Sequence, residues 1–189
     1  MGEYEDKMAL SDDEVIHLAT LGDKDAFSIL YQKYINKIYT YIFYRTGNAN
    51  DAEDLTARVF YRALGHIKSY QQKGIPFSAW LYRIAHNIVA NWHRDNSRRR
   101  EVSLEDHLEI AQKDDYPENT LVHAQMAENL MANIRRLPSD RQQLIILKFV
   151  ERLSNSEVAT IMGRSEGAIK SLYHRTLTTL RFYIEKDEG

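Results

Sequence analysis

Apolar side chains recur at intervals of three and four residues along most of this chain, and this spacing constrains its fold more than any other feature. The clearest series, within residues 26–47, is Phe27, Leu30, Tyr31, Tyr34, Ile38, Tyr41 and Ile42. Such spacing places the apolar side chains on one face of a helix. Only three prolines and eight glycines interrupt the 189 residues, so few positions disfavour helix. With no segment that alternates in the manner of a strand, the sequence predicts an all-α protein.

Short polar residues before each apolar series indicate where the helices begin, because their side chains can accept hydrogen bonds from the first turn. Ser11, Ser139 and Ser154 are each followed three residues later by Glu or Gln, which is the pattern of a capping box. The residues expected at helix N-termini are Ser11, Asp23, Asn50, Ser139, Ser154 and Ser165. Gly47 and Gly163 are expected to end helices in the left-handed conformation.

Charge is distributed in blocks, although the whole chain carries a net charge of only −2. The net charge is −6 in residues 1–30, +8 in 31–100, −7 in 101–131 and +3 in 132–189. Two basic blocks on either side of an acidic one are typical of two modules that face a polyanion, joined by a linker. An uneven distribution of charged residues over a surface that binds no partner would give the same net charges.

The helical pattern fades between residues 95 and 118, where the acidic block lies. We therefore predict two small helical domains, at residues 1–95 and 119–189, joined by a flexible acidic linker at residues 96–118.

Several function classes are disfavoured by what the chain lacks. It has no cysteine, and its seven histidines are scattered without metal-ligand spacing. It has neither a glycine-rich phosphate loop nor a nucleophile elbow. We predict no enzymatic activity, no metal and no cofactor. No apolar run approaches the roughly 20 residues that span a bilayer, and the first residues are acidic rather than signal-like, which predicts a cytoplasmic protein without membrane insertion.

Residues 156–175, SEVATIMGRSEGAIKSLYHR, have the pattern of a helix-turn-helix. Two short apolar series flank Gly163, and Ala159 is small where the two helices would cross. With Ile169 and Leu172 buried, the second helix would expose Glu166, Lys170, Ser171, His174 and Arg175. Such a helix fits the major groove of DNA. A plain three-helix bundle with a solvated face has the same spacing.

These residues resemble region 4 of the extracytoplasmic-function (ECF) bacterial sigma factors. The positions that match the family pattern are, in order, EVA, G, EGAIKS, HR and LR within the segment SNSEVATIMGRSEGAIKSLYHRTLTTLR. Residues 26–34, 51–56 (DAEDLT) and 77–87 (FSAWLYRIAHN) are similar to region 2 of the same family. The resemblance covers most of residues 25–183, and it implies a protein that directs core RNA polymerase to specific promoters.

For region 4, the resemblance implies a recognition helix in the major groove of the −35 element. The residues assigned to DNA binding there are Arg164, Ser165, Glu166, Lys170, Ser171, His174 and Arg175. The family often has Arg directly after Lys-Ser, where this chain has Leu172.

For region 2, the resemblance implies opening and reading of the −10 element. A base pulled from the stack is stabilised by a protein pocket and by aromatic stacking. The residues assigned to this DNA are Lys68, Tyr70, Lys73, Tyr82, Arg83, Asn87, Asn91 and Arg94. The arginine run at 98–100 is assigned to phosphates. The stripe formed by Trp80, Ile84, Ile88 and Trp92 is expected to belong to the core.

Polymerase docking is implied for the helix that carries the DAEDLT segment. The residues assigned to it are Asp51, Glu53, Asp54, Thr56 and Phe60. Carboxylates at a helix start are also favoured by the helix dipole alone. The family often has Gln and Glu after the Thr, where this chain has Ala57 and Arg58.

The partners implied by the resemblance are core RNA polymerase, promoter DNA as duplex and as opened strand, and an anti-sigma protein. A one-component helix-turn-helix regulator that acts without polymerase is the first alternative, and it predicts duplex binding by the chain alone. A helical bundle that binds only another protein is the second, and it predicts no salt-dependent affinity for DNA.

Overall fold

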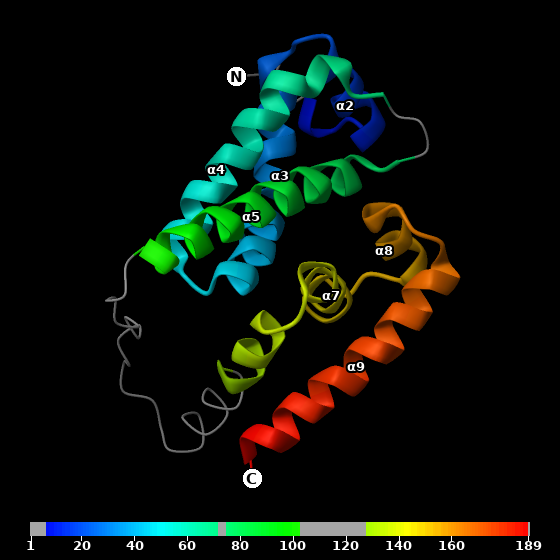
Figure 1. Ribbon diagram of the computed structural model, residues 1–189. Coiled ribbons are helices and arrows are strands. Elements are labelled where there is room, and N and C mark those ends of the chain that lie inside the picture. Colours follow the sequence, from blue (N-terminus) through cyan, green and yellow to red (C-terminus); the bar gives the residue numbers. More distant parts are fainter. Residues whose placement is uncertain (1–6, 72–74, 103–127, 189) are drawn as a thin grey trace, which may run out of the picture.

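The computed structural model describes residues 7–71, 75–102 and 128–188, and these form helices joined by short turns (Figure 1). None of the described residues lies in a β-strand, so the prediction of an all-α fold is confirmed. The N-terminal half contains α2 (Asp12–Thr20), α3 (Lys24–Thr46), α4 (Ala49–His66), the 3₁₀ turn η1 (Ile67–Ser69) and α5 (Phe77–Val102). The C-terminal half contains a helix at residues 128–135, then α7 (Ser139–Ile145), the π-helical turn η2 (Ile146–Val150), α8 (Asn155–Met162) and α9 (Glu166–Glu188).

Most predicted helix ends are confirmed. Ser11 and Ser154 each form a complete capping box, and the Asp23 carboxylate accepts from the first turn of α3. Gly47 ends α3 with φ 72°, a backbone conformation that residues other than glycine rarely adopt.

Two predicted N-caps are wrong. Asn48, rather than Asn50, caps α4 and accepts from the Asp51 N–H. Ser139 lies inside α7, which Pro138 precedes without a side-chain cap. The Gln142 side chain instead donates to the carbonyl groups of Arg135 and Leu137 just before the helix.

α5 continues through the start of the predicted linker and ends at Val102. The physical reason is that no Gly or Pro lies between Phe77 and Val102, and Arg and Glu in the last turns favour helix. The remainder of the predicted linker, residues 103–118, lies outside the described residues.

The N-terminal half is a bundle of α3, α4 and α5, with α2 packed on one end against α3 (Figure 1). Its fully buried side chains include Leu30, Ile38, Leu55, Val59 and Leu81. Each comes from the apolar face of its helix, and burial of one such side chain stabilises a fold by about 1.5–3 kcal/mol. Tyr31, which was expected on the buried face of its helix, is 40% exposed.

The C-terminal half packs directly on the N-terminal half. Its buried residues Leu144, Leu147, Val158 and Ile169 belong to the same apolar cluster as the core of α3, α4 and α5. α8 packs against α5 and η2 against α3, and α9 extends away from the contact (Figure 1). A smaller cluster holds the far end of α9 against the helix at 128–135 and α7.

Candidate functional site

The helix-turn-helix predicted at residues 156–175 is present as α8, a tight turn and α9. Gly163 has φ 63°, and its N–H donates to the Ala159 carbonyl, which ends α8. Ser165 begins α9, because its hydroxyl accepts from the Ala168 N–H at 3.2 Å. Val158 of α8 and Ile169 of α9 are both fully buried, so the angle between the two helices is fixed by packing.

The outer face of α9 is exposed along the length that would enter a DNA groove. The exposed residues there are Glu166, Lys170, Ser171, His174 and Arg175. Lys170 forms an ion pair with Glu166 one turn away at 3.2 Å, a contact that a phosphate could replace at little cost because surface pairs are weak. Leu172, which stands where the family often has Arg, is 4% exposed and belongs to the core.

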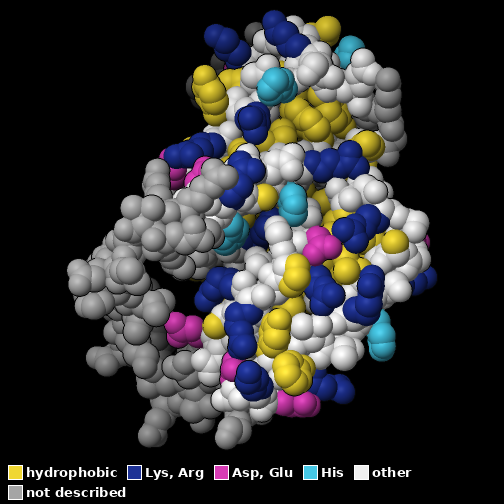
Figure 2. Space-filling view, viewed as in Figure 1, with side chains coloured by type: hydrophobic (Ala, Val, Ile, Leu, Met, Phe, Trp, Pro, Cys, Tyr) yellow, Lys and Arg dark blue, Asp and Glu magenta, His cyan; other side chains and the backbone are white. Residues whose placement is uncertain are grey.

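Arg164 and Ser165 lie at the turn, next to the same face. The Arg164 guanidinium donates to the Asp140 carboxylate of α7 at 3.1 Å. The Ser165 hydroxyl is occupied by its capping role, although the residue is exposed. On the face seen in Figure 2, Lys and Arg side chains are spread over both halves, whereas Asp and Glu are sparse.

Four of the predicted −10-reading residues are exposed: Lys68, Asn87, Asn91 and Arg94. Lys68 lies in η1, and the other three lie on α5. Lys73 and the side chains of Arg98–Arg100 lie outside the described part of the structure.

Tyr70 is half-buried at the base of the loop before α5. Its hydroxyl donates to the Ile75 carbonyl at 2.8 Å. Its ring lies edge-on to Phe77 and tilted on Trp80, with centroids 5.5 and 5.1 Å away. This aromatic cluster fixes the two ends of the loop to α5.

The stripe of Trp80, Ile84, Ile88 and Trp92 packs against the core, as expected. Ile84 is buried, and the other three are half-buried against the main apolar cluster.

Tyr82 and Arg83, predicted to contact DNA, are held by the C-terminal half in this structure. Tyr82 is 3% exposed, and its hydroxyl donates to the Glu151 carboxylate at 2.8 Å. The Arg83 guanidinium donates to the carbonyl groups of Thr160 and Ile161 at 2.6 and 3.0 Å. These carbonyls end α8, where a cation is favoured by the helix dipole. Neither side chain is available to DNA while the two halves are in contact.

The predicted polymerase-docking residues divide into two groups. Glu53 and Asp54 are exposed on the outer face of α4, and Asp51 is half-exposed in its first turn. Thr56 and Phe60, by contrast, are 4% and 5% exposed. These two side chains lie on the apolar face of α4, where Phe60 packs edge-on to Tyr31, so in this structure they contribute to the core rather than to the surface of α4.

A groove of about 610 Å³ between α4 and α5 runs beside Asp51 and Asp54. Its lining includes Tyr61, Arg62 and Trp92, which we had not assigned to a site. The Tyr61 side chain is 83% exposed. An aromatic residue off the apolar stripe of its helix was the signal in the sequence that could have identified it.

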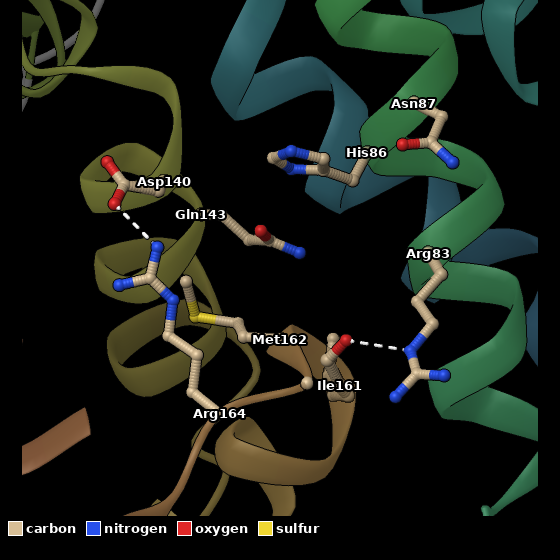
Figure 3. A pocket seen from close by; sticks show the side chains of 9 residues that line it. Arg83, His86, Asn87, Asp140, Gln143, Ile161, Met162 and Arg164 are labelled. Carbon is tan, nitrogen blue, oxygen red and sulfur yellow. Dashed lines mark hydrogen bonds and ion pairs between the residues drawn. The ribbon is translucent and has the colours of Figure 1, made fainter. Parts of the chain in front are cut away.

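A pocket of about 330 Å³ lies where α5 meets α7 and α8 (Figure 3). Arg83, His86 and Asn87 line it from α5, and Asp140 and Arg164 line it from the C-terminal half. Residues assigned to both DNA elements thus face each other across this pocket.

Arg45, near the end of α3, is fully buried beside this pocket. Its guanidinium donates to the Tyr41 hydroxyl at 2.8 Å and to the Ser139 hydroxyl of α7, and lies 3.1 Å from Nδ1 of His86. Among the described residues, no Asp or Glu pairs with it. Sequence reasoning missed this residue, because a basic residue in the last turn of a helix is ordinary.

Burial, together with the nearby Arg45 guanidinium, lowers the pKa of His86 to about 4, while Asp140 opposes the shift. An unfolded chain protonates His86 near pH 6.5, so the folded chain binds fewer protons between pH 6.5 and 4. Stability therefore decreases as the pH falls through that window.

We expect the free energy of unfolding to fall between pH 7 and pH 5 by about 1 kcal/mol from this group, allowing for its partial exposure. His86→Gln, which cannot be protonated, is expected to remove most of this dependence. Urea unfolding at both pH values measures it. An equal loss of unfolding free energy in the parent and in the variant would show that other groups cause the pH dependence. The carboxylates of Glu14, Asp23 and Glu157 have lowered pKa values. Their contribution to stability is therefore lost only at lower pH.

Within the described part of the chain, no helix is long and apolar enough to cross a membrane. The same residues contain no cluster of three His, Asp or Glu side chains that could hold a metal ion.

Comparison with known proteins gives two matches in the order expected from the motifs. Sigma-70 region 2 matches residues 30–99, and Sigma-70 region 4 matches residues 127–180. The ECF RNA polymerase sigma factor SigW of Bacillus subtilis is 30% identical over 168 residues, covering 85% of this chain and 89% of SigW. This chain belongs to the ECF family of RNA polymerase sigma factors.

A second ECF sigma factor, BldN of Streptomyces coelicolor, is 37% identical to this one over 174 residues. The match covers 92% of this sigma factor but spans only 66% of the length of BldN. Among solved structures, the sigma factor RpoE of Bartonella quintana, in complex with the anti-sigma factor NepR, has a similar fold. Its TM-score is 0.64 at 21% identity, covering 84% of this chain and 96% of that one.

Proposed function

We propose that this sigma factor binds core RNA polymerase and directs it to a specific set of promoters. The observation that carries the proposal is the order of the two sigma regions, with a helix-turn-helix in the second whose basic outer face is exposed. Region 2 melts and reads the −10 element, and region 4 reads the −35 element. Catalysis of RNA synthesis belongs to the polymerase, so the chain has no enzymatic activity of its own.

The division of labour follows the two halves of the fold. The first domain extends to Val102, where α5 ends, and the second begins near residue 119. The exposed part of α5, with Asn87, Asn91 and Arg94, supplies hydrogen-bonding and cationic groups for opened DNA. Region 4 uses Lys170, Ser171, His174 and Arg175 from the first turns of α9, which is the part of a recognition helix that meets base edges.

Polymerase docking is proposed on the outer face of α4. Glu53 and Asp54 are exposed there beside the groove between α4 and α5. Charged rims of this kind set the rate and specificity of association.

The remaining partners follow from the family. An anti-sigma factor is proposed as a regulator, because a sigma factor of similar fold has been solved in complex with one. Core polymerase and promoter DNA lie in the bacterial cytoplasm, so we propose that this protein acts there.

Run-off transcription with purified core polymerase and a genomic DNA library tests the proposal. We expect defined transcripts only when this protein is added. The absence of any transcript with both proteins folded would overturn it. Band-shift measurements with and without core polymerase separate it from a one-component regulator, because that alternative predicts specific duplex binding by the chain alone.

A further inference from the structure

Gln143 of α7 is a buried amide that points into the pocket of Figure 3. The residue is only 4% exposed, and its side chain is directed toward α5 across the pocket (Figure 3). Among the described residues, none forms a hydrogen bond with this amide. The neighbouring Gln142, by contrast, donates to two carbonyl groups. Because buried polar side chains are normally hydrogen-bonded, the amide of Gln143 indicates that this pocket is built to bind a polar group.

His86 of α5 supplies a second hydrogen-bond donor to the same pocket. Its Nδ1 lies 3.1 Å from Nη1 of Arg45. A guanidinium has only donors, so Nδ1 is the acceptor and Nε2 carries the proton in the neutral ring. Burial and the Arg45 guanidinium lower the pKa of His86, so the ring stays neutral at pH 7. The Nε2–H group, which donates to none of the described residues, is therefore left as a donor for the pocket that His86 lines.

Two arginines line the pocket from opposite sides (Figure 3). Arg83 of α5 donates to the carbonyl groups of Thr160 and Ile161 through Nη2 and Nε. Arg164, in the turn after α8, donates to the Asp140 carboxylate through Nη2. A guanidinium carries five N–H groups, so each arginine keeps N–H groups that these contacts do not use.

The pocket has an excess of positive charge. Its lining contains two guanidinium groups but only one carboxylate, that of Asp140. The fully buried Arg45 lies directly behind His86 and pairs with no Asp or Glu among the described residues. Water can satisfy an amide, but it cannot balance this charge, and a buried cation is costly unless it is paired. The group that fits the pocket is therefore an anion.

The arrangement of the donors favours a phosphoryl group over a carboxylate. Donors reach the pocket from α5, from α7 and from the turn after α8. A carboxylate offers two oxygens in one plane, whereas a phosphoryl group offers three strong acceptor oxygens and close to two negative charges at neutral pH. Guanidinium groups bind phosphate with good geometry. The volume of about 330 Å³ is at the lower end of the range for small-molecule sites.

We propose that this pocket binds a small phosphorylated ligand, either inorganic phosphate or a small phosphomonoester. Gln143 and Nε2 of His86 donate to the phosphoryl oxygens, and Arg83 and Arg164 balance their charge. The proposal goes beyond the proposed function, because neither polymerase nor promoter DNA takes part in the binding. It can therefore be tested on the purified full chain alone.

Gln143 is the residue to change, because it has no hydrogen bond to lose within the described structure and no assigned role on DNA or polymerase. Gln143→Leu keeps the size of the side chain and removes the donor. Loss of an unpartnered buried amide should leave the stability unchanged or raise it. Gln143→Glu is nearly isosteric and places a carboxylate in the positively charged pocket, where it would take the place of the ligand. Gln32→Leu and Gln32→Glu, at an exposed position on α3, are the matched controls.

Isothermal titration calorimetry at pH 7.5 and constant ionic strength measures the binding. The probes are inorganic phosphate, adenosine monophosphate as a phosphomonoester, acetate as a carboxylate, and a ten-nucleotide DNA single strand as a phosphodiester. We expect saturable binding of phosphate or of adenosine monophosphate at one site per chain, and at least about tenfold weaker binding of acetate. Loss of one hydrogen bond to a charged group should weaken phosphoryl binding by Gln143→Leu at least about tenfold. Gln143→Glu should abolish it, and the Gln32 variants should bind like the parent.

Urea unfolding provides an independent measurement. A ligand that binds only the folded chain raises its stability, so phosphate should stabilise the parent and the Gln32 variants but not Gln143→Glu. If Gln143→Leu does not fold, as judged by circular dichroism, Gln143→Glu decides by both measurements.

The proposal is overturned if the parent binds neither phosphate nor adenosine monophosphate, or if the Gln143 variants bind them as tightly as the parent. Binding of the DNA single strand without competition from either small ligand would assign these cationic groups to promoter DNA and would also contradict the site. Phosphoryl binding by a chain that fails in run-off transcription would contradict the proposed function and leave this site in place.

Discussion

Replacing Asp54 with arginine is expected to abolish the capture of core RNA polymerase by this sigma factor. The Asp54 side chain is 61% exposed on the outer face of α4 and pairs with Arg58 one turn later at 2.7 Å. The substitution would place two arginines one turn apart and reverse the charge at the proposed docking face. Like charges across an interface cost several kcal/mol, which corresponds to a loss of affinity of at least about 100-fold.

A pull-down with purified core polymerase measures this loss. The surface position of Asp54 predicts a change in stability within about 0.5 kcal/mol, so the variant should melt like the parent protein. Asp187→Arg is the matched control, because Asp187 is also an exposed carboxylate that pairs with an arginine, but it lies at the end of α9. Full retention of polymerase by Asp54→Arg would move docking to another face of region 2.

Local features of this fold could be predicted from the sequence. Capping boxes at Ser11 and Ser154 were predictable because the hydrogen bonds that form them join residues three apart. The helix-turn-helix was equally predictable, since Gly163 and the apolar positions on each side define the turn. In each case, the information lies within one or two turns of helix.

The misplaced caps show where local reasoning reaches its limit. Asn48 and Asn50 are both suitable N-caps, but Gly47 takes the left-handed conformation at the end of α3, and α4 begins directly afterwards. Ser139 has the residue type and spacing of a capping box. Its hydroxyl is instead used by Arg45, which is 94 residues away in the chain.

The contact between the halves could not be predicted from periodicity. Arg83 and Ile161 are separated by 78 residues, and no pattern in either helix specifies the other. Arg83 was therefore assigned to DNA, although in this structure the end of α8 provides the acceptors for its guanidinium. Burial of Thr56 and Phe60, in contrast, follows from the apolar face of α4, and the family motif led us to give these residues a binding role.

The second large effect is expected from Lys170→Ala combined with Arg175→Ala. Both side chains lie on the exposed face of α9, and the ion pair between Lys170 and Glu166 is an exposed pair one turn apart, worth only about 0.3–0.5 kcal/mol. The fold should therefore be retained. Loss of two cationic contacts, at about 1–3 kcal/mol each, corresponds to a loss of promoter affinity of at least about 30-fold, and transcription from a cognate promoter should fall accordingly.

The matched control for this variant is Arg181→Ala with Lys186→Ala, which removes the same two residue types from exposed positions further along α9. It should transcribe at the level of the parent, because those turns lie beyond the part of a recognition helix that enters the groove. Unchanged transcription by the Lys170 and Arg175 variant would refute the assignment of α9 as the recognition helix.

Salt dependence distinguishes a loss of phosphate contacts from a loss of base reading in the same variant. Each neutralised phosphate contributes about −0.9 to the slope of log affinity against log salt concentration. If Lys170 and Arg175 bind phosphates, holoenzyme carrying the double variant should show a slope shallower by about two on duplex that contains the −35 element. If they read base edges, the slope should change less, and discrimination between the cognate and a mutated −35 element should fall instead. The Lys170 ammonium already has an anionic partner, Glu166, one turn away. A phosphate would replace that partner, so we expect the loss of Lys170 to make the salt dependence shallower.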